Sequence, residues 1–255
     1  MRYMLAICLF ILTNNTYANT QSSSLNWISP IDNRQITGLL LQKEALPKDA
    51  PVAILLHAMN THTYHWLATG APTYGGQITD FLLDKGYRII ALDARAHGHR
   101  KYEDSAEARM DKANNGEPES YLEMIEGTVK DYEFALTKIE KNFADAKHIV
   151  AIGYSMGAQM AIMLAAKNPQ IDHLITMVPP HAGNVSIVSP VTFAPKVKAK
   201  WLLLLANKDE YSTARENNEI ADAISAPHQR IDFDSGHVLP ETYVFTVKQW
   251  LDAIK

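Results

Sequence analysis

The chain is predicted to be an α/β protein in which helices cover both faces of a mostly parallel sheet. Short, continuously apolar runs alternate along the sequence with longer segments of helical periodicity, and polar loops separate them. Continuously apolar strands are typical of parallel sheets that are buried on both faces. The expected strands are residues 52–56, 88–92, 148–152, 173–178, 201–206 and 230–233, and the expected helices are residues 77–85, 120–142, 156–167, 213–224 and 241–254.

The segments before residue 50 have a different pattern. Residues 25–28 and 35–43 alternate between apolar and polar side chains, and residues 29–33 between them are rich in turn formers. This pattern predicts two antiparallel edge strands joined by a turn. The polar residues 21–24 are expected to be a flexible lead into the first strand.

Three loops determine what can cover a site at the sheet edge. Residues 58–76 are rich in His, Tyr and Trp, and residues 98–119 are polar and charged, so one or both are expected to overhang the site. The connection at residues 179–200 is short and is interrupted by Pro180, Pro190 and Pro195. It leaves no room for a large cap domain.

Composition narrows the class of protein. The 255 residues are 47% hydrophobic and 20% charged, which is ordinary for a folded globular chain, and the formal net charge is −4. This balance provides no basic surface for nucleic acid, so a small-molecule substrate is expected. No repeat or linker divides the chain, and one domain is predicted.

The first 18 residues have the pattern of a secretory signal peptide. Arg2 precedes an apolar run at residues 4–12, and Thr16 and Ala18 supply the small residues of a cleavage site. We expect cleavage after Ala18, a secreted or periplasmic mature domain at residues 19–255, and no integral membrane segment in it. Cys8 is the one cysteine, so the mature chain would have neither a thiolate nucleophile nor a disulfide.

The strongest chemical signal is Gly-Tyr-Ser-Met-Gly at residues 153–157. It lies between an expected strand and an expected helix, where a tight turn would project the hydroxyl of Ser155 above the sheet. The start of the helix also directs unpaired N–H groups toward an oxyanion beside Ser155. Ser155 is therefore the predicted nucleophile.

A serine nucleophile needs a histidine base and a carboxylate that orients the histidine. His237 follows the last apolar strand and comes before the terminal helix, so we expect it to be the base. Asp209 follows the strongly apolar strand at residues 201–206 and is the predicted acid. The adjacent Glu210 is the alternative, although its longer side chain would leave the strand end in another direction.

These motifs resemble the α/β-hydrolase superfamily, in particular its bacterial esterase and lipase-like branch, from residue 36 to the C-terminus. His57-Ala58-Met59 is similar to the family's oxyanion loop, residues 93–98 are similar to its Asp-x-Arg-Gly-His-Gly turn, and the positions of Ser155, Asp209 and His237 are similar to its triad. The resemblance implies an oxyanion hole formed by the N–H groups of Met59 and Met156. It also implies a structural role for Asp93 and Arg95. Ala58, Ala96 and Ser235 stand where the family usually has glycine.

Other residues have weaker interpretations. Histidines gather in two loops, but no cysteine or paired carboxylate completes a familiar ligand set, so neither a metal nor any other cofactor is expected. Aromatic residues of the loop at 58–76 either line a substrate pocket or pack in the core, and the sequence leaves both open. The histidines are His57, His62, His65, His97 and His99, and the aromatic residues are Tyr64, Trp66 and Tyr74.

The predicted function is hydrolysis of carboxylic esters with small or compact acyl groups through an acyl-enzyme. The short connection at residues 179–200 and the polar loop at 101–119 offer no amphipathic lid, so no activation at a lipid surface is expected. An amidase or peptidase would use the same triad. A catalytically silent binding protein on this fold is a further alternative. The oligomeric state is left open.

Overall fold

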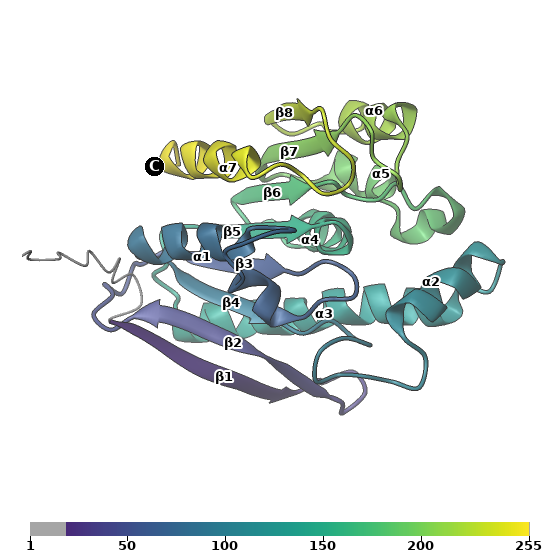
Figure 1. Cartoon of the computed structure of the whole chain (residues 1–255). Coiled ribbons are helices and arrows are strands. Elements are labelled where there is room, and N and C mark those ends of the chain that lie inside the picture. The colour runs from purple at the N-terminus through teal and green to yellow at the C-terminus, as the bar shows by residue number, and fades with distance from the viewer. Residues whose placement is uncertain (1–18, 255) are drawn as a thin grey trace, which may run out of the picture.

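The computed structural model describes residues 19–254, in which eight strands form one sheet in the order β1-β2-β4-β3-β5-β6-β7-β8 (Figure 1). The antiparallel strands β1 and β2 lie at one edge, and β8 lies at the other. From β4 to β8 all neighbouring strands are parallel. The strands are β1 (Thr20–Ile28), β2 (Gln35–Lys43), β3 (Val52–Leu56), β4 (Arg88–Leu92), β5 (Ile149–Tyr154), β6 (His173–Met177), β7 (Lys200–Ala206) and β8 (His228–Phe233).

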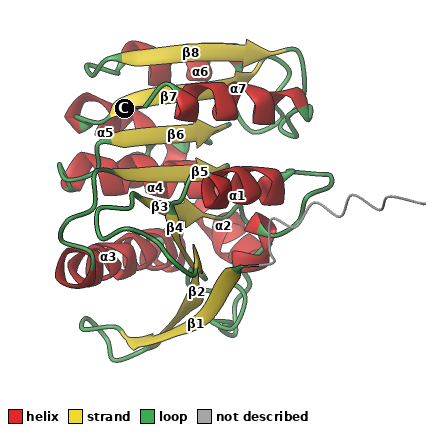
Figure 2. Cartoon of the chain, turned by 90° about the vertical axis from the view of Figure 1, so that its left-hand side faces the viewer, coloured by secondary structure: helices red, strands yellow, loops and turns green. Residues whose placement is uncertain are grey.

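Helices cover both faces of the sheet, as Figure 2 shows. On one face, α3 (Glu119–Asn142), α4 (Met156–Lys167) and α6 (Ala214–Asp222) pack on a core that contains Ile54 and Leu203. On the other face, α1 (Gly75–Asp84) and α7 (Thr242–Asp252) pack on a core that contains Leu55 and Leu204. Successive strand residues thus enter opposite cores, which explains why these strands are apolar throughout. The predicted fold class is confirmed.

The connection from β6 to β7 contains only short helices and no cap domain. These are η2 (Gly183–Val188), α5 (Pro190–Phe193) and η3 (Ala194–Lys196). Another short helix, η1 (Thr63–Trp66), lies in the loop after β3. The loops that follow β3, β4, β5, β7 and β8 therefore surround the carboxyl edge of the sheet without a large cover.

Two details of the prediction are wrong. Residues 21–24 are not a flexible lead but belong to β1, where Ser22 and Ser23 pair with Leu41 and Leu40. Part of the polar loop at 98–119 forms α2 (Ala106–Asn114), whose N-terminus is capped by the Ser105 side chain accepting from the Ala108 N–H. Backbone pairing and a cap, rather than an apolar pattern, stabilise these two segments.

The predicted signal peptide lies outside the described residues. Within residues 19–254, no helix is both long and apolar enough to span a membrane. Next to the start of β1, the Asn19 carbonyl oxygen accepts a hydrogen bond from the Glu44 N–H.

Candidate active site

Ser155 occupies a sharp turn between β5 and α4. Its φ of 53° and ψ of −120° are an unusual conformation for a residue with a side chain, which the surrounding structure must hold in place. The flanking glycines are required for a steric reason. A Cβ at Gly153 would lie 2.2 Å from the Gly157 carbonyl oxygen, and one at Gly157 would lie 2.1 Å from the Leu56 carbonyl oxygen. The motif thus exposes the serine hydroxyl in the manner that its sequence predicts.

The structure brings Ser155, His237 and Asp209 into one hydrogen-bonded row. His237 Nε2 lies 2.7 Å from Ser155 Oγ, and His237 Nδ1 lies 2.9 Å from Asp209 Oδ2. The Asp209 side chain is only 2% exposed, and its Oδ1 also accepts from the Tyr211 N–H at 2.8 Å. A buried, immobilised carboxylate at Nδ1 leaves Nε2 free to accept a proton from the serine.

The backbone of His237 is held from two sides by residues that sequence reasoning did not place there. Its N–H donates to Glu210 Oε2 at 2.7 Å, and its carbonyl oxygen accepts from the Tyr154 hydroxyl at 3.0 Å. The same hydroxyl accepts from the Leu239 N–H, and burial raises the pKa of Tyr154 to about 12. Glu210 therefore contacts the histidine main chain, whereas Asp209 contacts the ring. Only the position of Tyr154 inside the motif could have signalled its role.

The N–H groups of Met59 and Met156 are available at the pocket that contains Ser155. Met156 begins α4, so its N–H has no partner within the helix. Neither N–H donates a hydrogen bond within the described chain. Both residues line the same pocket as Ser155 and His237. Two unpaired N–H groups at one pocket can donate to a negative oxygen beside the serine.

His57 fixes the loop that carries Met59. The Ala94 N–H donates to His57 Nε2 at 2.9 Å, so the proton of the neutral ring is on Nδ1, which donates to the Ala58 carbonyl at 2.8 Å. Burial, with a smaller contribution from His97, lowers the pKa of His57 to about 3 and keeps the ring neutral. Ala58 does not have a positive φ, so alanine fits here in place of glycine. Ala96 does, with a φ of 63°.

Asp93 and Arg95 are buried structural groups. The Asp93 carboxylate accepts from the Thr37 hydroxyl, from the N–H and hydroxyl of Thr63, and from the His99 N–H. Burial alone would raise the pKa of Asp93, but these hydrogen bonds hold it below its usual value. Arg95 pairs with Asp131 of α3 at 3.0 Å. Asp93 thus ties the loop after β3 to β2.

A pocket of about 250 Å³ opens beside Ser155, and it is called the Ser155 pocket below. Its walls include Met110 of α2, Tyr121 of α3, Pro180 and Val238. The aromatic residues of the loop at 58–76 are not among its lining residues. Trp66 is buried and Tyr74 partly buried in the core beneath α1, whereas Tyr64 is exposed outside this pocket. The packing alternative therefore fits Trp66 and Tyr74.

The clustered histidines do not form a ligand set. Among residues 19–254, no group of three or more His, Cys, Asp or Glu side chains is placed to hold a metal ion. His57 and His97 instead pack edge to face, with ring centroids 5.2 Å apart.

A model of the dienelactone hydrolase family matches residues 68–237. The chain belongs to the dienelactone hydrolase family. The matched segment includes Ser155, Asp209 and, at its end, His237. Membership of this family places the chain among the hydrolases of the α/β-hydrolase superfamily, as the sequence motifs indicated.

The chain is also similar to one curated sequence relative and to several solved structures. The uncharacterized protein RP471 of Rickettsia prowazekii is 22% identical over 203 residues, which cover 75% of this chain and 70% of the relative. A cold-adapted esterase from an Arctic intertidal metagenomic library has a TM-score of 0.72 at 18% identity, over 92% of this chain and 94% of the other. An acetyl xylan esterase from Paenibacillus sp. R4 also has a TM-score of 0.72, at 13% identity over 96% of this chain and 87% of the other. At identities this low, the TM-scores of 0.72 show a shared fold and nothing more.

Proposed function

We propose that this family member is a serine esterase that cleaves carboxylic esters of small or compact acyl groups. The observation that carries the proposal is the hydrogen-bonded row in which His237 Nε2 lies 2.7 Å from Ser155 Oγ. A histidine at this distance from a serine is the arrangement that activates a hydroxyl nucleophile. The names of the structural relatives, an acetyl xylan esterase and a cold-adapted esterase, favour an ester over an amide.

The reaction would proceed in two displacements. His237 Nε2 takes the hydroxyl proton of Ser155 as Oγ attacks the ester carbonyl carbon, and Asp209 stabilises the resulting imidazolium. The negative oxygen accepts hydrogen bonds from the N–H groups of Met59 and Met156. The bond to the alcohol oxygen then breaks, and His237 returns its proton to that oxygen. Water repeats these steps on the acyl-enzyme, releasing the acid and restoring Ser155.

The size of the Ser155 pocket supports the compact acyl group. A volume of about 250 Å³ is below the range of roughly 300 to 1,000 Å³ found for drug-sized ligands. The pocket has mostly apolar walls, which suits the hydrocarbon part of an acyl group. Because α2 buries only Ala106, Arg109 and Ala113, it lacks the broad apolar face of a lid that opens on lipid.

The decisive experiment compares the wild-type protein with Ser155→Ala on p-nitrophenyl acetate. We expect a loss of about 10³-fold or more in kcat, because the members of a triad act together. A fluorophosphonate should label the wild-type protein and not the variant, while circular dichroism shows that both are folded. A variant that kept a tenth of the activity would exclude Ser155 as the nucleophile. Turnover of aminoacyl p-nitroanilides in preference to esters would favour the amidase alternative.

We also propose that the protein is exported and processed after Ala18. The support is the sequence pattern of Arg2, the apolar run and the small residues Thr16 and Ala18. Cleavage at this point would leave β1, which begins at Thr20, complete. Intact-mass measurement of protein recovered from the periplasm of an exporting host should give a chain that begins at Asn19, and recovery of the uncleaved chain would contradict export.

A further inference from the structure

Two more hollows follow the Ser155 pocket along the same edge of the sheet. The middle pocket, of about 450 Å³, shares Asn60 and Thr61 with the Ser155 pocket. The β1–β2 pocket, of about 400 Å³, shares Tyr64 and His99 with the middle pocket. Because each hollow shares lining residues with the next, the three form a row of neighbouring hollows, called the path below, from Ser155 to the first two strands.

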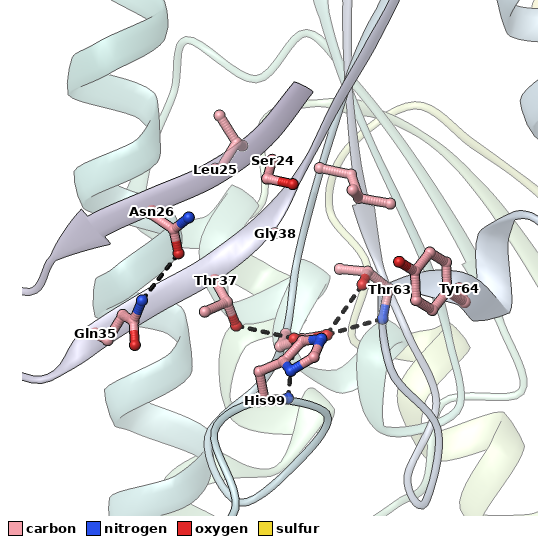
Figure 3. A pocket seen from close by; sticks show the side chains of 11 residues that line it. Ser24, Leu25, Asn26, Gln35, Thr37, Gly38, Thr63, Tyr64 and His99 are labelled. Atoms are coloured by element: carbon pink, nitrogen blue, oxygen red, sulfur yellow. Dashed lines mark hydrogen bonds between the residues drawn. The ribbon is translucent and has the colours of Figure 1, made fainter. Parts of the chain in front are cut away.

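The chemistry of the lining changes along this path. The Ser155 pocket has apolar walls, whereas the β1–β2 pocket is lined mainly by hydroxyl and amide groups, including Thr37 and Thr63. In Figure 3, the side chains of β1 and β2 lie on one side of the β1–β2 pocket and Tyr64 on the other. An apolar end beside the nucleophile and a polar end far from it suit a substrate with one apolar and one polar part.

Several polar groups of the β1–β2 pocket are free to bind a ligand. Asn26 Oδ1 accepts from Gln35 Nε2 at 2.9 Å, which leaves the Asn26 amide donors and the Gln35 carbonyl oxygen unused. The hydroxyls of Ser24 and Tyr64 have no hydrogen-bond partner within the described chain. Together these groups offer both donors and acceptors.

The β1–β2 pocket offers no free charge. Asp93 is the one carboxylate among its lining residues, and it is 1% exposed with both oxygens already accepting hydrogen bonds. The middle pocket is lined by a single lysine or arginine, Lys101. The path therefore fits a neutral polar ligand better than a phosphate or a nucleotide.

We propose that the middle and β1–β2 pockets bind the alcohol part of the ester, and that this alcohol is a carbohydrate. A sugar carries neutral hydroxyls that both donate and accept, and its apolar ring face can stack on the exposed ring of Tyr64. When Ser155 attacks the acyl carbon, the bond to the sugar oxygen breaks and that oxygen takes the proton from His237. The free sugar hydroxyl then leaves along the polar path while the acyl group stays on Ser155. This inference depends on the proposed esterase function.

The test measures kcat/KM for ethyl acetate and for mono-O-acetylated glucose, cellobiose and cellotriose, each sugar ester as a mixture of positional isomers. For the wild-type protein, we expect the ratio of the cellotriose ester to ethyl acetate to exceed about 10. Tyr64→Ala and Asn26→Leu should each lower this ratio about fivefold to tenfold, the equivalent of one or two lost contacts. Phe245→Ala removes an exposed ring on α7, away from these pockets, and should leave the ratio unchanged.

Different failures have different meanings. Hydrolysis of ethyl acetate with no gain for any sugar ester would overturn the carbohydrate proposal and leave the esterase intact. A ratio that Tyr64→Ala and Asn26→Leu both leave unchanged would also overturn it, because the gain would then arise elsewhere. Faster hydrolysis of N-acetyl-dialanine ethyl ester than of any sugar ester would assign the path to peptides instead. No turnover of any ester by the wild-type protein would refute the esterase proposal itself.

Discussion

Asp209 and Glu210 are adjacent carboxylates that reach different atoms of His237. Both oxygens of Asp209 lie within 3.0 Å of the ring nitrogen Nδ1, whereas Glu210 accepts from the backbone N–H. Asp209 is also nearly buried, and Glu210 is exposed. A carboxylate on the ring sets the tautomer of the base, but one on the main chain only restrains the loop.

This difference predicts unequal effects of two isosteric substitutions. Asp209→Asn should lower kcat on p-nitrophenyl acetate about 10³-fold or more, because an amide that donates to Nδ1 places the remaining ring proton on Nε2, where it blocks the serine. Glu210→Gln keeps an acceptor for the His237 N–H and should cost less than about tenfold. If Glu210→Gln were the more damaging change, the assignment of the acid would have to be reversed.

Gly98 and Gly116 both have positive φ values but differ in their surroundings. A Cβ at Gly98, with φ 54°, would lie 2.5 Å from the Asp93 carboxyl carbon, whereas a Cβ at Gly116, with φ 90°, would meet nothing within 4 Å. Gly116→Ala should therefore cost about 1 kcal/mol of unfolding free energy, for backbone strain alone. Gly98→Ala should cost about 3 kcal/mol, because it also disrupts the hydrogen bonds of a buried carboxylate. Urea denaturation of both variants measures the difference, and equal losses would exclude the steric contribution.

At the scale of elements, the sequence predicts the strands and helices whose apolar side chains recur at a regular spacing. The central strands and the long helices appear at their expected places, and Ser155, Asp209 and His237 meet because each follows a strand that ends at the same edge of the sheet. The sequence shows which residues follow the end of a strand, but it does not show the direction in which their side chains point. Glu210 could therefore be named as a neighbour of the triad, but its bond to the His237 main chain could not be foreseen.

The segments that were missed depend on contacts between distant residues. Helix α2 has a polar sequence and is stabilised by the Ser105 cap and by the ion pair of Arg109 with Glu123 of α3, at 2.7 Å. Strand β1 has a polar start, but its backbone pairs with β2 along all nine residues. The Ser105 cap is local, but no local pattern encodes Glu123 or the pairing of residues 20–24 with β2. The Met110 wall of the Ser155 pocket was missed for the same reason, because it requires α2 to be in place.

Met110 provides the test of the acyl preference at this scale. It lines the Ser155 pocket from α2 and packs against the core beneath α3, α4 and α6. We expect the wild-type protein to be fastest on p-nitrophenyl esters of about two to four acyl carbons, and Met110→Ala to shift the optimum toward longer chains because the pocket gains the volume of the side chain. Met163→Ala, a buried methionine of α4 that does not line the pocket, is the matched control and should not shift the optimum. A wild-type rate that rises past about ten carbons, or that jumps when the substrate exceeds its solubility, would contradict the compact pocket.

For the molecule as a whole, buried histidines link stability to pH. Burial lowers the pKa of His57 to about 3 and the pKa of His65 to about 4, and partial burial together with the neighbouring His148 lowers the pKa of the half-buried His173 to about 4. These three rings stay neutral in the folded chain, while in the unfolded chain they take up protons below a pKa of about 6.5. Their contribution is therefore complete above about pH 6.5 and is lost as the pH falls toward the folded values.

The stability of the protein should decrease steeply between about pH 6.5 and pH 5, before the carboxylates begin to titrate. Near pH 5 the unfolded chain binds about one more proton than the folded chain at each fully buried ring, so His57 and His65 each lower the free energy of unfolding by about 1 kcal/mol per pH unit, and the half-buried His173 contributes less. Urea denaturation at a series of pH values measures this slope. His173→Phe removes the half-buried member of the three groups while keeping an aromatic ring beside Trp250, and it should lower the slope by less than a third. If the protein were equally stable at pH 7 and pH 5, the buried histidines would have to gain protons without unfolding, and the neutral His57 that orients the Met59 loop would be excluded.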